Sequence, residues 1–184
     1  MKADRKAYPE KAQALRCMTA VELLRFFGGL EPPDFSEMDG EYEATLLNQG
    51  SDWTGTAHLS FLNGPLHGFW LGKAFTPASR NDGHGYNMFF RSGQVRRHYR
   101  MSTTITASRF DGKPAFRLLY SDYNSLCGYV RMIDEVRRVD EGLYLGIGAY
   151  GIIRKTPLPF ILRGPIGPFL GSDKEEKWPF KRLL

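Results

Sequence analysis

The chain has little cysteine: Cys17 and Cys127 are the only two. One falls in an N-terminal stretch that we expect to be helical and the other beside a turn, so they form neither a disulfide framework nor a metal-binding motif. No run approaches the roughly 18 continuous apolar residues of a membrane-spanning helix. Residues 1–11 are charged and lack the apolar core of a signal peptide. We therefore expect a soluble, cytoplasmic protein with free thiols.

Signatures of catalysis and metal binding are also missing. The histidines lie on separate segments without H-x-x-x-H spacing: His58, His67, His84 and His98. The chain has no G-x-S-x-G nucleophile elbow and no Walker-type phosphate loop. Cys127, next to a glycine, is more typical of a small buried hydrophobe than of a nucleophile. The sequence thus assigns no catalytic residue, metal or cofactor, and leaves open whether the protein is an enzyme.

Aromatic residues and turn formers are abundant instead. Aromatics make up 14% of the 184 residues, beside 20 glycines and 11 prolines, a composition that favours sheets joined by turns. The length and the hydrophobic content of 42% predict one domain with a sizeable core. The net charge of +5 fits a solvated basic surface.

From Asp39 to Tyr150 the residue pattern reads as strand, turn, strand, which predicts a mainly β fold. Short glycine-containing links between the segments predict antiparallel hairpins. The expected architecture is an up-and-down barrel of about eight strands. The predicted strands are Gly40–Leu47, Gly68–Phe75, Tyr86–Arg91, Gln94–Ala107, Pro114–Ser121, Gly128–Val139 and Leu143–Tyr150, with Pro159–Leu162 as a possible eighth.

The segments outside these strands suggest three parts of a single domain. Residues 1–38 form a helical segment and linker, 39–150 the barrel, and 151–184 a C-terminal strap rich in proline and glycine. Thr19 and Glu22 have the spacing of a capping box and predict a short helix ending at Gly28. This helix is mostly apolar and should pack either over one end of the barrel or on its outer wall.

Charges alternate with apolar residues in Gly128–Val139. Val130, Met132 and Val136 share one face, and the other carries Tyr129, Arg131, Glu135 and Arg137. Inside a barrel such charges would have to pair and would orient the polar head of a ligand. Outside it they would form an ion-pair ladder of modest energy. The pattern alone does not say which face points inward.

A second basic stretch runs from Arg96 to Arg100. Its arginines and tyrosine resemble a nucleic-acid patch, with bases stacking on Tyr99. Strand alternation, however, divides these charges between two faces, so only half could meet one partner. We favour a solvated strand face and expect no nucleic-acid partner.

Several short motifs together resemble a known group of proteins. Gly68–Phe75 contains G-x-W-x-G followed by Lys-x-Phe, Asp39–Ala44 is a weaker echo, and Asp134–Val139 and Gly142–Gly146 follow later. Together they are similar to poorly characterised bacterial proteins of the G-x-W-x-G type, which resemble the lipocalin and fatty-acid-binding (calycin) superfamily. The resemblance implies a lipocalin-like barrel and supplies no catalytic residues. In a lipocalin the motif opens the first strand; here it falls on the second, which makes Trp70 a wall or cap residue.

We predict from these features that the barrel binds a small, largely apolar ligand, either fatty-acid-like or another hydrophobic molecule with an anionic head. Two alternatives stay open: an isomerase, cyclase or lyase acting on a hydrophobic substrate in the same cavity, and a filled barrel that acts as a protein-interaction module. The candidate ligand-binding residues are Trp70, Phe90, Tyr99, Tyr120 and Tyr144 for the apolar wall, Lys73, Arg131 and Arg137 for the head group, and Glu135 to hold an arginine.

Overall fold

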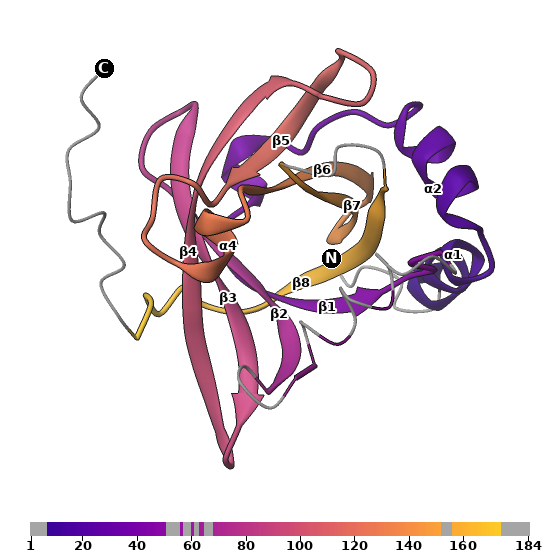
Figure 1. Ribbon diagram of the computed structural model, residues 1–184. Coiled ribbons are helices and arrows are strands. Elements are labelled where there is room, and N and C mark those ends of the chain that lie inside the picture. The colour runs from indigo at the N-terminus through magenta and orange to yellow at the C-terminus, as the bar shows by residue number, and fades with distance from the viewer. Residues whose placement is uncertain are drawn as a thin grey trace.

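The computed structural model describes residues 7–50, 56, 60, 63–64, 68–151 and 156–173. Eight antiparallel strands form a closed barrel in which neighbours in sequence pair and the last strand returns to the first (Figure 1). The predicted mainly β, up-and-down barrel is therefore confirmed. The strands are β1 Gly40–Leu46, β2 Phe69–Pro77, β3 Asp82–Arg91, β4 Gln94–Ala107, β5 Pro114–Leu119, β6 Met132–Asp140, β7 Leu143–Tyr150 and β8 Leu158–Gly167.

Besides β3, which begins at Asp82 rather than at the predicted Tyr86, two segments differ from the predicted strands. The start of Gly128–Val139 is not extended, because Leu126–Tyr129 forms the one-turn helix α4. The Ser125 side chain caps this turn by accepting from the Gly128 amide at 3.1 Å, so β6 begins only at Met132. The second difference is β8, which is longer than Pro159–Leu162 and pairs with both β7 and β1. The barrel thus continues past the predicted boundary at Tyr150.

Two N-terminal helices lie against the outer wall of the barrel. They are α1 Ala7–Arg16 and α2 Ala20–Phe27. The predicted capping box starts α2, since the Glu22 amide donates to Thr19 Oγ1 and the Thr19 amide donates to Glu22 Oε2. Figure 1 shows both helices on one side of the barrel. The apolar contact joins Ala12, Leu15, Leu23 and Phe27 to Ala115, Leu143, Leu145, Ile147 and Ile161. Of the two positions that the sequence allowed, the helix takes the outer wall.

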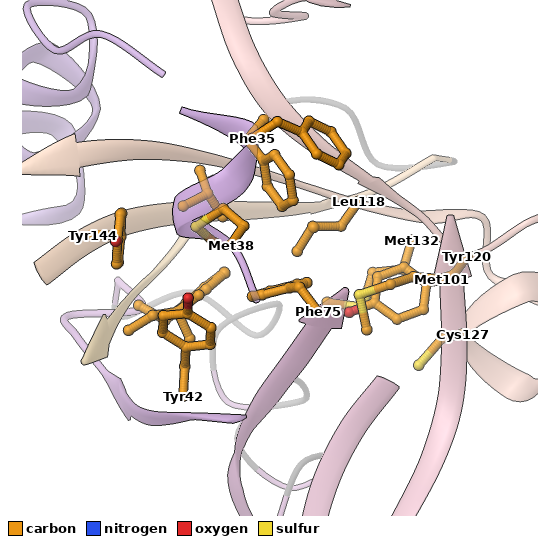
Figure 2. Packing of buried hydrophobic residues seen from close by; sticks show 14 residues of the cluster. Phe35, Met38, Tyr42, Phe75, Met101, Leu118, Tyr120, Cys127, Met132 and Tyr144 are labelled. Atoms are coloured by element: carbon orange, nitrogen blue, oxygen red, sulfur yellow. The ribbon is translucent and has the colours of Figure 1, made fainter. Parts of the chain in front are cut away.

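A second apolar cluster fills the lumen (Figure 2). It runs from Tyr42 and Tyr144 at one end to Tyr120 and Cys127 at the other. The 3-10 helix η1, Phe35–Glu37, closes the first end. There the Tyr42 hydroxyl donates to the Glu37 carbonyl, and the Tyr144 hydroxyl donates to Glu37 Oε2 at 3.2 Å. We call this the η1 end and the opposite one, beside α4, the α4 end.

Residues 168–173 run along the outside of β3 and β4. The Phe169 ring packs on Tyr86 at 4.9 Å between centroids, and the Leu170 amide donates to the Tyr86 hydroxyl at 3.0 Å. Asp173 then bonds the backbone of Arg97 twice, through its amide and through its carboxylate, each at 2.9 Å. These residues form an extended strap. Of the predicted strap, residues 152–155 and 174–184 lie outside the described residues, and Leu158–Gly167 is strand β8.

Candidate functional site: a buried polar centre in the lumen

A group of polar side chains lies inside the otherwise apolar lumen. It consists of Lys73 on β2, Asn87 on β3, Tyr120 just after β5, and Asp134 on β6, all buried. On β6 the inward positions are Met132, Asp134 and Val136, so a carboxylate takes a place in an apolar row. The barrel therefore places both members of an ion pair in its interior.

The Lys73 ammonium is the hub of this centre. It lies 2.8 Å from Asp134 Oδ2 and donates to Asn87 Oδ1 at 2.9 Å and to the Tyr120 hydroxyl at 2.6 Å. The Tyr120 hydroxyl in turn donates to Asp134 Oδ2 at 2.9 Å. Three partners match the three N–H groups of an ammonium. The pattern fits a charged lysine paired with a charged aspartate.

Aromatic rings surround the same ammonium. Lys73 Nζ lies 5.2 Å from the ring centroids of Trp70 and Phe160 and 5.3 Å from that of Tyr120. Cation–π attraction of this kind is stronger where water is excluded. A buried ion pair is tolerated only with good geometry and further hydrogen bonds. Here the rings, the hydroxyl and the Asn87 amide supply them.

Burial determines the protonation state of the Tyr120 hydroxyl. It raises the pKa of Tyr120 well above the ordinary value of 10.0, and the charge of Asp134 raises it further. The pKa of Tyr150 is raised by burial first, and then by Cys127 and Asp134. Tyr120 therefore stays protonated over the physiological range and acts as a hydrogen-bond donor to Asp134.

Asp134 is one of the residues that line a small cavity. Oδ1 is buried and has no hydrogen-bond partner among the residues that the structure describes. The cavity holds about 10 Å³ of open space, close to what a single water molecule needs. A Cβ atom at Gly148 would lie 2.8 Å from Oδ1, so this glycine leaves the room. We call the space the chamber; its lining is Trp70, Lys73, Asn87, Phe89, Tyr120, Cys127, Met132, Asp134, Gly148, Leu158 and Phe160.

The structure brings three of the predicted site residues together in the chamber: Trp70, Lys73 and Tyr120. Tyr99 packs against the lumen cluster and contacts the chamber residue Phe89, with 5.6 Å between ring centroids. Tyr144 lies in the lumen but at the η1 end, where it bonds Glu37. Phe90 is 45% exposed, unlike its buried neighbour Phe89. The predicted apolar wall is thus only partly assembled at one place.

The remaining three predicted residues lie away from the lumen, because the inward positions of β6 belong to Met132, Asp134 and Val136. Arg131 is exposed and precedes β6. Glu135 accepts from the Ser108 hydroxyl and from the Arg109 amide. Arg137 is buried beneath α2 and bonds Asp111. Among the residues predicted for the head group, the structure thus places Lys73 in the lumen and the two arginines outside it.

Asn87, Asp134 and Gly148 belong to the site but were not among the predicted ligand-binding residues. The signal for Asp134 was present in the sequence, since it shares strand parity with Met132 and Val136. A lone carboxylate on the apolar face of a strand is costly to bury without a purpose. Asn87 and Gly148 carry no comparable signal, because an amide or a glycine is ordinary in many strand positions.

Comparison with known proteins supports the fold alone. No protein-family model matches the chain, and no curated protein matches it. A crystal structure of a protein from Thermomonospora curvata is similar over 89% of this chain and 98% of that chain, with a TM-score of 0.61 and 18% sequence identity. Likeness at this level of identity agrees with the barrel architecture and carries no activity to this chain.

Other kinds of site find no support in the described part of the chain. Its histidines, cysteines and acidic residues form no group of three or more that could hold a metal ion. Cys17 is exposed, Cys127 is buried in the lumen, and neither forms a disulfide. Of the helices described, none has the length and apolar character needed to cross a membrane. The lumenal polar centre is therefore the candidate that we develop.

Proposed function

We propose that this protein binds a small, largely apolar molecule in the chamber. The observation that carries the proposal is Asp134 Oδ1, a buried carboxylate oxygen without a partner among the described residues, on a side chain that lines the cavity. The surrounding side chains are mostly apolar or aromatic, with a few convergent polar groups. That combination is typical of small-molecule sites in proteins.

Stability alone gives a poor account of the polar centre. Replacing a buried ion pair by well-packed apolar residues is often neutral or stabilising, and the rest of the lumen shows that this barrel can be filled with Phe, Tyr, Met and Leu side chains. A buried acceptor without a hydrogen bond adds a further cost of about 1–3 kcal/mol. A ligand that bonds this oxygen would remove that cost, which is why we assign the centre to binding.

Entry of a ligand requires side chains to move, because the open space is near the size of one water. Met132 lines the chamber, and its flexible thioether adapts readily to a new neighbour. Trp70, Tyr99 and Tyr150 are only half-buried and lie at the α4 end of the lumen. We propose that the apolar body of the ligand enters at this end and displaces these side chains.

Native mass spectrometry of protein purified from its own host, repeated after denaturation and extraction, tests the proposal. We expect a bound species of defined mass that partitions into organic solvent. Two matched variants on the inward face of β8 locate it. Leu158→Phe adds bulk in the chamber, whereas Leu162→Phe adds the same bulk nearer the η1 end. Occupancy should fall on the order of tenfold in the first variant and be retained in the second.

The opposite result would count against the chamber. If no small molecule co-purifies, and if titration with short and medium-chain alcohols, amines and carboxylates produces no binding heat, the barrel is not a binding protein of this kind. Equal loss of occupancy in both variants would mean that the ligand lies elsewhere or that the variants act through stability.

A filled barrel that acts as an interaction module is the second candidate. One observation favours it: Phe69, Phe90 and Val95 pair across β2, β3 and β4 and are 66%, 45% and 40% exposed. An exposed apolar row of this kind is typical of a contact surface. Phe90→Ser should abolish any self-association or partner binding under this candidate and leave ligand occupancy unchanged under the first. The enzyme alternative has no comparable observation, and we propose no reaction.

A further inference from the structure

We infer that the polar group of the ligand is a neutral hydroxyl that donates to Asp134 Oδ1, so that the chamber takes an apolar alcohol rather than a fatty-acid-like anion. This inference rests on the proposed function and specifies the ligand of the same site. It follows from which hydrogen-bonding groups of the polar centre are already used, from the charge of the centre, and from the size of the cavity.

The donors of the centre are all engaged. The Lys73 ammonium has its three partners, and the Tyr120 hydroxyl donates to Asp134. Trp70 Nε1 donates to Asn87 Oδ1 at 3.1 Å. The two N–H groups of Asn87 Nδ2 reach the Tyr120 hydroxyl at 3.1 Å and the Tyr99 carbonyl at 3.4 Å. A ligand that offers only acceptors would therefore have to break one of these bonds.

The group of the polar centre that lacks a hydrogen-bond partner among the described residues is an acceptor. Asp134 Oδ2 accepts from the Tyr120 hydroxyl and forms the ion pair with Lys73, while Oδ1 receives no bond from the described residues. A carboxylate oxygen has no hydrogen to give, so its partner must be a donor. A ligand hydroxyl satisfies it with a charge-assisted hydrogen bond, the stronger class of such bonds.

Charge and size both favour a neutral group. Lys73 and Asp134 lie 2.8 Å apart and their charges cancel, so the centre offers no net attraction for a ligand ion that would lose its hydration. An anionic head would also face the Asp134 oxygen directly. The open space of about 10 Å³ matches one oxygen atom with its hydrogen. A carboxylate, with two oxygens, needs more room.

Calorimetric titration with four probes of one chain length tests the inference: decanol, decanoate, decylammonium and methyl nonyl ether. We expect decanol to bind at least about tenfold more tightly than each of the others, because the others lose the donor or bring a charge. Binding of decanoate or the ether as tightly as decanol would overturn the inference while leaving the proposed function intact. Binding of none of the four would overturn both.

Asp134→Asn should reverse the preference. The Tyr120 hydroxyl donates to Oδ2 and the Lys73 ammonium lies beside it, so the amide oxygen of the asparagine should take that position. Its NH₂ group would then point into the chamber where Oδ1 was. The chamber would offer a donor in place of an acceptor, and we expect the ether to bind at least as tightly as decanol. An unchanged preference for decanol would contradict the assigned contact.

Gly148→Ala gives a second test that keeps the ion pair. Its Cβ would lie 2.8 Å from Oδ1 and so occupy the space of the ligand hydroxyl. Decanol should lose its advantage of about tenfold over the ether. Gly167→Ala is the matched control, because a Cβ there meets nothing within 4 Å, and it should keep the advantage. A full preference for decanol in Gly148→Ala would overturn the inference even if Asp134→Asn fails to fold.

Discussion

Arg137 shows that a buried charge need not belong to a binding site. All five of its N–H groups are used: Nε donates to the Pro114 carbonyl, Nη1 to the Phe27 carbonyl and Asp111, and Nη2 to Asp111 and the Lys113 carbonyl. The bond from the guanidinium is also the main cause that lowers the pKa of Asp111. The residue thus ties the end of α2 and the turn between β4 and β5 to β6.

Replacing Arg137 by lysine should be costly for this reason. The ammonium keeps the charge but cannot reproduce the planar fork that bonds Asp111 through two nitrogens. We expect the free energy of unfolding in urea to fall by about 3 kcal/mol, with ligand occupancy per folded molecule unchanged. Arg138→Lys is the matched control on the next residue, whose salt bridge to Glu37 is partly exposed, and it should change stability by less than about 0.5 kcal/mol. If Arg137→Lys instead lost ligand occupancy without losing stability, Arg137 would have to be counted among the ligand-binding residues.

The sequence predicted the two faces of β6 but not their direction. Alternation separates Arg137 from Asp134, yet both residues are buried. The reason is that β6 is covered on both sides. The lumen cluster covers its inner face, and on its outer face the Phe27 ring of α2 lies over the Arg137 guanidinium, with 4.4 Å between the ring centroid and Cζ. Where both faces of a strand are covered, polarity no longer marks the inner one. Which face points inward then depends on how the strand sits in the folded barrel.

At the scale of elements, β7 shapes the lumen through its glycines. Gly146 and Gly148 fall on the same inward face as Tyr144 and Tyr150. A Cβ atom at Gly146 would lie 2.2 Å from Cζ of Phe160, so the ring of Phe160 rests directly on this backbone. Gly146-Ile147-Gly148 lies inside a strand and not at the strand-to-helix turn that a dinucleotide-binding motif requires. The structure gives it a local role, which is to make room for an aromatic ring and a carboxylate.

Gly146→Ala should therefore displace the Phe160 ring, one of the three that surround Lys73. We expect a loss of about 1–3 kcal/mol in the free energy of unfolding, the usual cost of adding a methyl group to a filled core. Gly167→Ala on β8, where the added methyl enters open space, should be neutral or slightly stabilising. Chemical denaturation of both variants checks the difference. Equal stability would mean that Phe160 can move without cost.

At the scale of the whole molecule, closure of the barrel was the part least accessible from sequence. Hairpins between neighbouring strands follow from short glycine-containing links, and the structure has them in order. Closure depends on β8 pairing with β1, for example Leu162 with Ala44, which no local pattern specifies. The proline- and glycine-rich composition of this region instead suggested a strap. Pairing with two neighbours holds the glycines and prolines of β8 in a strand, although their own preference for a strand is weak.

Four tyrosines of the lumen make the stability of the barrel depend on pH. Burial is the first cause that raises the pKa values of Tyr42, Tyr120, Tyr144 and Tyr150. A pKa raised in the folded state means that the folded chain holds protons which the unfolded chain has already lost. The stability that depends on these protons is fully present below about pH 10, the ordinary value for tyrosine, and is lost as the pH rises above it.

We therefore expect the barrel to unfold cooperatively at alkaline pH. Tyrosinate absorbance and far-ultraviolet circular dichroism, followed together from pH 8 upward, measure ionisation and strand content. The last step of tyrosinate absorbance should coincide with the loss of the strand signal, because the four lumenal hydroxyls ionise only when the barrel opens. Tyr120→Phe removes one of them and should make that step smaller. Complete ionisation of the tyrosines with an intact strand signal would show that the lumen admits hydroxide. The description of the polar centre as closed to solvent would then be wrong.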